Sequence, residues 1–175
     1  MNKKILFIPI ILVVALTAYY LSSSAGSGYI KGTFYSDTSV TDRKAYISEN
    51  FLSDKKLVFV DLKLKDSVSV LDFKGRKLPL GSYKDGAYLP LMIILTPSDQ
   101  VIAAVRVCEP CGSFSFHIEG SKYIVCDLCG TRWDIETLNG VSGGCASYPP
   151  PRLEELNDGG SVQVDLTSIG VQIAG

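Results

Sequence analysis

The five cysteines of this 175-residue chain all lie between residues 108 and 145. Four of them form two Cys-x2-Cys-Gly motifs, "CEPCG" from Cys108 and "CDLCG" from Cys126. A Cys-x2-Cys turn brings two sulfurs to one point, and the glycine after each pair permits the left-handed backbone that such a turn tends to require. Two facing turns supply four thiolates for a zinc ion, a single iron or a two-iron cluster. We therefore predict Cys108, Cys111, Cys126 and Cys129 as metal ligands.

Disulfide bonds and thiol redox catalysis are the alternative uses of these cysteines. Outside the cytoplasm thiols oxidise, and an odd number of cysteines leaves one over. A disulfide within Cys-x2-Cys closes a very short loop and constrains little chain. Thioredoxin-like chemistry normally uses one Cys-x2-Cys at the start of a helix in a βαβ setting, whereas these pairs lie among short β segments. The two motifs therefore favour a metal.

Two further residues are candidates for the surroundings of the metal. Cys145 follows two glycines and precedes three prolines in "GGCASYPPP", so we expect its thiol beside the site. There it would be an alternate or additional ligand, a disulfide partner or a hydrogen-bonding neighbour of the ligand sulfurs. A buried, unreactive thiol is the alternative. His117, the only histidine, is a second candidate ligand, although the alternating "FSFHI" favours a solvent-facing position for it.

Aromatic and acidic residues surround the same motifs. Phe114 and Phe116 alternate with polar residues, and with Trp133 they are expected to pack around the site. Acidic side chains lie near the loops at Glu109, Asp127, Asp134 and Glu136. They would attract Fe2+ or a cationic partner, or form a solvated rim. Because no Ser-His-Asp, His-Glu-x2-His or phosphate-loop motif is present, we predict a redox carrier or a binding module rather than an enzyme.

The composition argues against one class of partner. The chain has 17 basic and 18 acidic residues, a net charge of −1 and no basic stripe, so nucleic acid is not an expected partner. An apolar content of 46% is ample for the core of one globular domain.

The amino-terminal segment predicts a membrane anchor. Two lysines precede an apolar run from Ile5 to Leu21, and helix continued to Ala25 would approach the roughly 30 Å of a hydrocarbon core. The lysines place residues 1–4 in the cytoplasm, residues 5–25 in the plasma membrane as a single-pass signal anchor, and the rest of the chain outside. A signal peptide cleaved after Ala25 is the alternative, and it places the domain on the same side.

The remainder predicts a mostly β, antiparallel domain. Short alternating or apolar segments bounded by Gly, Asn, Asp or Ser predict strands. They cover residues 56–64, 66–73, 88–95, 99–107, 113–118, 122–126, 132–136 and 161–166. Helix signals are weak: residues 41–53 have partly helical spacing with Thr41 as a cap, and one turn is expected after the prolines. We divide the domain into a linker with an amino-terminal β region, 26–100, and a metal-binding β region, 101–175.

Residues 101–153 resemble the FtrD-like family of membrane iron-sulfur proteins, found beside bacterial ferrous-iron uptake components. The family pattern is a strand entering Cys-x2-Cys, a glycine, a second Cys-x2-Cys-Gly, a large aromatic residue, and Gly-Gly-Cys with prolines. The matching residues are Cys108, Cys111, Gly120, Cys126, Cys129, Gly130, Trp133, Gly143, Gly144, Cys145 and Pro149 to Pro151. The resemblance implies an electron-transfer protein with an iron-sulfur cluster or iron, linked to iron transport and served by a redox partner or permease.

A more distant likeness is to the second half of a Rieske domain, over "YIVCDLCGTRWDIETLNG" and "GGSVQVDL". Rieske loops each offer one cysteine and one histidine, whereas each loop here offers two cysteines, and all-cysteine ligation lowers the potential of a cluster. The expected site is therefore a two-knuckle, Rieske-like or zinc-ribbon-like centre. The alternative function is a structural zinc ribbon that mediates interaction with a membrane protein partner.

Overall fold

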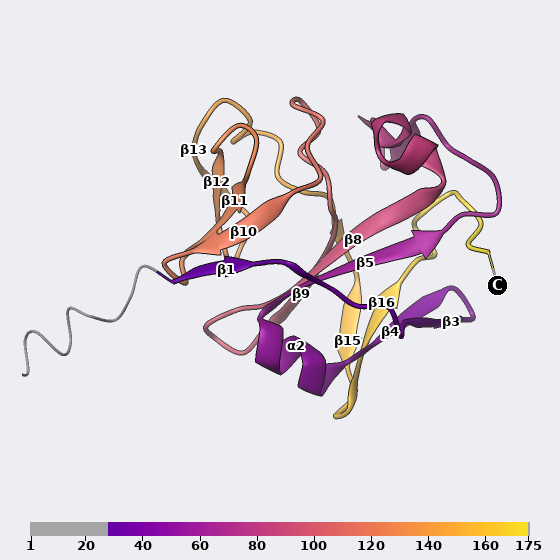
Figure 1. Cartoon of the computed structure of the whole chain (residues 1–175), viewed down its shortest axis with the longest axis horizontal. Helices are drawn as coiled ribbons and strands as arrows, with labels where there is room; N and C mark the ends of the chain where they lie inside the picture. The colour runs from indigo at the N-terminus through magenta and orange to yellow at the C-terminus, as the bar shows by residue number, and fades with distance from the viewer. Residues whose placement is uncertain (1–27, 175) are drawn as a thin grey trace, which may run out of the picture.

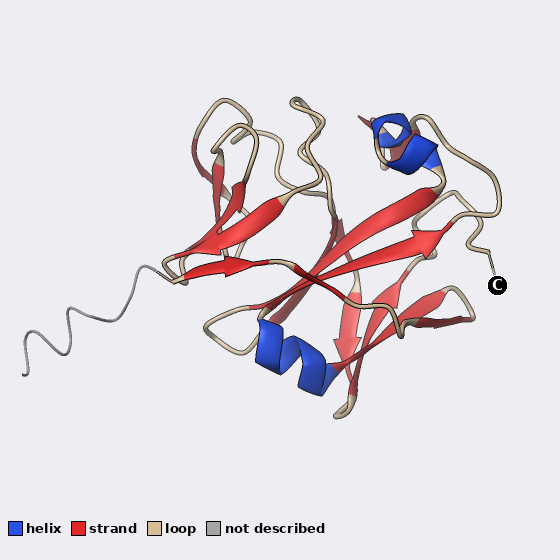
Figure 2. Ribbon diagram, viewed as in Figure 1, coloured by secondary structure: helices blue, strands red, loops and turns tan. Residues whose placement is uncertain are grey.

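The computed structural model describes residues 28–174, which are built mainly from β-strands (Figures 1 and 2). The mostly β prediction is confirmed for this part of the chain. Its helical segments are short: α2 (Glu49–Lys55), η1 (Leu80–Ser82) and η2 (Lys84–Gly86). The predicted membrane segment, residues 5–25, lies outside the described residues. Among residues 28–174, no helix has the length and apolar character needed to cross a membrane.

The central sheet has the strand order β14-β9-β8-β5-β2. Its strands are β14 (Arg152–Leu153), β9 (Val101–Val105), β8 (Tyr88–Leu95), β5 (Leu57–Lys63) and β2 (Thr33–Phe34). Every pair is antiparallel except β2 with β5, which is parallel. The sheet therefore combines strands from both sides of residue 100.

Two further sheets pack on this central sheet (Figure 1). The cysteine-bearing sheet has the order β1-β10-β11-β12-β13, with β1 (Tyr29–Lys31), β10 (Phe116–Glu119), β11 (Tyr123–Cys126), β12 (Arg132–Asp134) and β13 (Gly140–Ser142). The other has the order β15-β16-β4-β3, with β15 (Glu155–Asn157), β16 (Ser161–Asp165), β4 (Lys44–Ser48) and β3 (Ser39–Thr41). A separate hairpin joins β6 (Leu71–Phe73) to β7 (Arg76–Leu78).

The central strands are buried on both faces because each face has its own core. Along β5, Val58 and Val60 pack in the core shared with β4 and β16, while Phe59 packs in the core shared with the cysteine-bearing sheet. This division follows the alternation of side chains along a strand. Leu89 to Ile94 of β8 are likewise buried, which confirms that the apolar run at 88–95 is covered on both faces.

Both predicted helical segments need correction. Residues 39–48 form the β3-β4 hairpin, and the helix begins only at Glu49 because Ser48, not Thr41, is its cap. The Ser48 hydroxyl accepts a hydrogen bond from the backbone N–H of Phe51 at 3.4 Å. After the prolines, residues 152–157 form β14 and β15 rather than a helical turn, because β9 and β16 offer them backbone partners.

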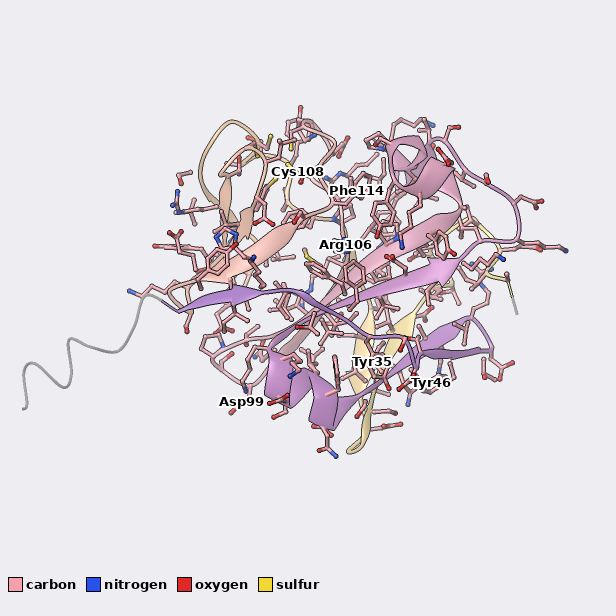
Figure 3. The ribbon with its side chains drawn as sticks, in the orientation of Figure 1. Tyr35, Tyr46, Asp99, Arg106, Cys108 and Phe114 are labelled. Atoms are coloured by element: carbon pink, nitrogen blue, oxygen red, sulfur yellow. The ribbon has the colours of Figure 1, made fainter. Side chains whose placement is uncertain are left out.

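A buried ion-pair network joins the central sheet to the first cysteine loop. Figure 3 labels its Arg106, together with Cys108 and Phe114. Arg106 follows β9 and is 2% exposed. Its guanidinium donates to the carboxylate of Asp61 at 2.7 Å and to the Tyr83 hydroxyl at 2.8 Å. The same group donates to the backbone carbonyl of Phe114 at 2.5 Å. Because Phe114 lies just beyond the first cysteine pair, Arg106 holds that loop on the sheet.

Replacing Asp61 by asparagine should lower the free energy of unfolding by about 3–5 kcal/mol, because Arg106 would remain buried without its counter-charge. Equilibrium unfolding in urea measures this change. The matched control is Asp72→Asn, which removes an exposed, solvent-screened pair with Lys77 and should leave the free energy of unfolding nearly unchanged. If the two variants lost the same small amount, the buried network would not stabilise the fold.

Candidate metal centre

The two cysteine loops share one backbone hydrogen-bond pattern. In each, the carbonyl of the first cysteine accepts from the glycine N–H four residues later, and the N–H of that cysteine donates to the carbonyl five residues later. The bonds are Gly112 N to Cys108 O (2.8 Å), Gly130 N to Cys126 O (2.9 Å), Cys108 N to Ser113 O (2.8 Å) and Cys126 N to Thr131 O (3.0 Å). Both glycines have the predicted left-handed backbone, with φ of +69° and +66°. The loops are therefore two copies of one rigid turn.

All the cysteine thiols gather where these loops meet (Figure 3 labels Cys108). The Sγ atoms of Cys108, Cys111, Cys129 and Cys145 all lie within 4.8 Å of one another. The Sγ of Cys126 lies 3.7 Å from that of Cys111, and the Sγ of Cys108 lies 3.9 Å from that of Cys129. Each of these two short contacts joins the first loop to the second. The structure thus brings three of the predicted ligands into one group of four sulfurs, whose fourth member is Cys145, and places the other predicted ligand, Cys126, beside Cys111.

The thiols differ in their access to solvent. Cys108, Cys126 and Cys145 are buried, Cys111 is half-buried and Cys129 is exposed. The residue before Cys129, Leu128, is 69% exposed. A metal held here would therefore be shielded on most sides, and Cys129 is the sulfur that another protein can approach.

Close packing shifts the cysteine pKa values in opposite directions. Hydrogen bonds from the Cys108 thiol and from the backbone N–H groups of Cys129 and Leu128 lower the pKa of Cys126 to about 4, against the effect of burial. The hydrogen bond to Cys126, together with burial, raises the pKa of Cys108. Burial raises the pKa of Cys111 to about 11. Cys126 therefore loses its proton readily, whereas Cys108 and Cys111 resist ionisation unless a cation compensates the charge.

Thr131 connects Cys129 to the loop that carries Cys145. Its side chain is fully buried, and its Oγ1 lies 3.2 Å from Cys129 Sγ and accepts from the Cys145 N–H at 3.2 Å. Burial opposes ionisation of Cys129, but hydrogen bonds from the Thr131 hydroxyl and N–H outweigh it and lower the pKa of Cys129. Sequence reasoning missed Thr131; the available signal was a hydroxyl residue two positions after a ligand cysteine.

His117 lies beside the second loop rather than among the thiols. Its Nδ1 contacts a carboxylate oxygen of Asp127 at 2.5 Å, and its ring packs on Tyr29 with 4.2 Å between centroids. The Ser115 hydroxyl donates to the same Asp127 carboxylate. Since Asp127 directly follows Cys126, these contacts brace the second loop from outside.

The other acidic residues near the loops also have protein partners. Glu109 holds the same position in the first loop as the aspartate in the second, and it accepts from Arg76 Nε at 2.8 Å. Asp134 accepts from the N–H of Glu136 at 3.1 Å, and the carboxylate of Glu136 accepts from the Ser98 hydroxyl at 2.5 Å. These carboxylates stabilise turns and loops, which leaves them less free to attract iron.

The aromatic residues expected around the site divide between the two cores. Trp133 and Phe116 are buried behind the cysteines, with 6.2 Å between ring centroids. The indole N–H of Trp133 donates to the carbonyl of Ala146 at 3.2 Å, which fixes the loop after Cys145. Phe114 instead packs on Tyr83, with 4.8 Å between ring centroids, and against the other core, so it does not join Trp133 and Phe116 around the site as expected.

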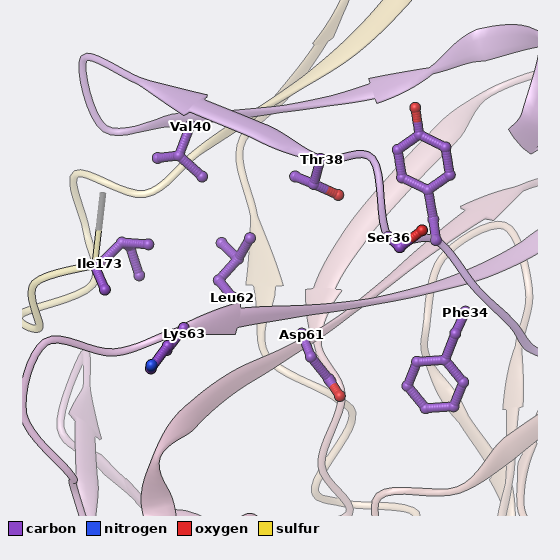
Figure 4. Close-up of a pocket in the computed structure, with 10 residues that line it drawn as sticks. Phe34, Ser36, Thr38, Val40, Asp61, Leu62, Lys63 and Ile173 are labelled. Carbon is purple, nitrogen blue, oxygen red and sulfur yellow. The ribbon is translucent and has the colours of Figure 1, made fainter.

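An open hollow of about 360 Å³ lies away from the thiols, between β5, the segment after β2 and the carboxyl-terminal residues (Figure 4). Phe34, Leu62 and Ile173 contribute apolar walls. Its one carboxylate, Asp61, is already bound to Arg106, Tyr83 and Lys84. The hollow contains none of the cysteines, so it is not part of the thiol site.

The fold and the site define a β-sheet protein with a clustered cysteine centre. The family model described as "Membrane iron-sulfur containing protein FtrD-like" matches residues 75–173, which is more than half of the chain and includes every cysteine. The chain therefore belongs to the FtrD-like family of membrane iron-sulfur containing proteins. Among curated proteins, no match was found.

The thiol group fits a metal in both chemistry and spacing. The clustered donors are all sulfur, as iron-sulfur proteins and structural zinc sites require. In a tetrahedral site with metal–sulfur bonds near 2.3 Å, the sulfurs lie roughly 3.8 Å apart. Two of the sulfur–sulfur contacts are 3.7 and 3.9 Å. Both contacts span the two loops, which places the loops close enough to share one metal.

Replacing Thr131 by valine should speed release of the bound metal by about tenfold, because loss of such an outer hydrogen bond typically weakens a metal site by 10–100-fold. Valine keeps the shape of the side chain but cannot bind Cys129 Sγ or the Cys145 N–H. Transfer of the metal to a coloured chelator measures the rate. Thr131→Ser, which keeps the hydroxyl, is the control and should release metal at close to the unaltered rate. Equal rates for the two variants would assign Thr131 a packing role only.

Proposed function

We propose that this protein is a membrane-anchored electron-transfer protein that carries iron, as an iron-sulfur cluster or a single ion, on the clustered cysteine thiolates. The observation that carries the proposal is the convergence of four sulfurs within 4.8 Å of one another in a chain of an iron-sulfur family. Bound iron would supply one-electron chemistry. The residues of the chain would bind it, shield it and limit its reorganisation.

The loops suit a redox carrier because they hold their ligands rigidly. Each has its own internal hydrogen bonds, and each is braced from another element, by Arg76 on Glu109 and by His117 on Asp127. Rigid ligands keep a similar geometry in both oxidation states, so little of the reaction energy goes into movement. All-cysteine ligation favours a low potential. Cys129, exposed at the surface, offers a short route for an electron to a partner.

The location and partner belong to the same proposal. The positive amino terminus and apolar run of residues 1–25 support a single-pass anchor in the plasma membrane with the described domain outside. The family description, which includes the word membrane, supports this placement. The partner we propose is a redox protein or permease in the same membrane, and the process is iron transport.

A structural zinc ribbon remains the second candidate function. Two contacts between sulfurs of the two loops favour it, at 3.7 and 3.9 Å. These distances suit a single tetrahedral ion, including zinc. In that case the domain would bind a membrane protein partner without electron transfer.

Anaerobic purification of the full chain in detergent, followed by metal analysis and visible spectroscopy, distinguishes the two. Electron transfer predicts iron, thiolate-to-iron absorption, bleaching by dithionite and recovery of the spectrum on reoxidation. Colourless protein that contains zinc would contradict it. Cys111→Ser should lose the absorption, whereas Ser147→Ala, at an exposed position of the Cys145 loop, should keep it.

A further inference from the structure

The thiol group contains one sulfur more than a four-coordinate metal requires. The ligand set that the two motifs define and the group of four sulfurs within 4.8 Å of one another share Cys108, Cys111 and Cys129. The two sets differ only in their fourth member, Cys126 in one and Cys145 in the other. We propose that Cys126 and Cys145 are interchangeable ligands for one coordination position of the same metal. The inference rests on the proposed function only in requiring that the site binds a metal.

Cys126 is held in position by regular structure. It is the last residue of β11, where it pairs with Phe116 of β10, and its backbone bonds to Gly130 and Thr131 close the second loop. Its side chain is fully buried, and its Sγ lies 3.7 Å from Cys111 Sγ. The Cys126 thiol therefore faces the other sulfurs and is shielded from solvent.

Cys145 is held in position by tertiary contacts with the second loop. Its backbone N–H binds the Thr131 hydroxyl, and its carbonyl accepts from the Tyr148 N–H at 2.9 Å. Gly143 has φ of +99°, and a Cβ there would lie 2.6 Å from Thr131 Oγ1. Only glycine permits the loop to approach so closely. Several contacts of the fold therefore hold Cys145 among the sulfurs.

Two buried thiols beside one coordination position allow the metal to change a ligand without becoming accessible to solvent. Cys126 and Cys145 are 0% and 7% exposed. In the exchange one metal–sulfur bond breaks and another forms. A proton passes from the incoming thiol to the outgoing thiolate, and no electron moves. The metal remains bound to the three shared cysteines throughout.

Cobalt titration of the full chain, purified without metal under reducing conditions, tests the inference. Co2+ is the probe because its thiolate-to-metal and d–d absorption report ligand type and tetrahedral geometry whichever metal is native. Cys126→Ser and Cys145→Ser should each bind one equivalent with a tetrahedral spectrum. The double variant should bind about 100-fold more weakly than either, as should Cys111→Ser, the control that lacks a shared ligand.

One result would overturn the inference by showing that Cys145 is no ligand. In it, Cys126→Ser loses cobalt binding, while Cys145→Ser keeps the stoichiometry, affinity and spectrum of the unaltered protein. The reverse pattern would overturn it by excluding Cys126. Circular dichroism checks the fold of each variant, and alanine versions replace any serine variant that does not fold. Finding native zinc instead of iron would defeat the proposed electron transfer but would leave these cobalt results unchanged, so the two failures are distinguishable.

Discussion

Clustered thiols in a buried site cannot all ionise without a cation, and the rest of the structure depends on this constraint. Sulfurs of the two loops lie 3.7 and 3.9 Å apart, so neighbouring thiolates would repel one another; accordingly, the pKa of Cys126 is lowered while that of Cys108 is raised. A bound metal removes the conflict by accepting several thiolates at once. The energy of ligation then also stabilises the fold, since the loops come from different parts of the chain.

Each cysteine loop is fixed to a different part of the molecule, and this explains why a mostly β frame surrounds the site. Arg106 holds the first loop on the central sheet through the carbonyl of Phe114, and Arg76 of the β6-β7 hairpin holds Glu109. The second loop is held by β10 through Asp127 and by Thr131. The central sheet, buried on both faces, is the rigid base that both loops share.

The sequence was most informative where the relevant contacts are local. The two motifs predicted paired thiols and left-handed glycines because a Cys-x2-Cys-Gly turn is determined by neighbouring residues, and Gly112 and Gly130 have that backbone. The glycines and prolines around Cys145 similarly indicated a loop near the site. Alternation along 56–64 and the apolar run at 88–95 predicted strands correctly, although the alternation indicated a half-buried strand and β5 is buried on both faces from Leu57 to Val60.

Contacts between distant segments could not be predicted in this way. Arg106 meets Asp61 across 45 residues of chain, and Phe114 packs on Tyr83, which lies 31 residues earlier, rather than with Phe116. The role of Thr131 depends on the Cys145 loop folding back onto it. Ser48 rather than Thr41 caps the helix because residues 39–48 pair as β3 and β4, and such pairing depends on tertiary context that local propensity does not determine.

The most direct test of the central claim is X-ray absorption at the metal edge of the full chain as purified. A metal bound by this group should show a first shell of sulfur only, with four sulfurs at roughly 2.3 Å. The same shell should persist, at nearly unchanged distance, after chemical reduction of an iron-containing sample. A first shell that contains oxygen or nitrogen would contradict the account, because it would mean that the clustered cysteines do not hold the metal.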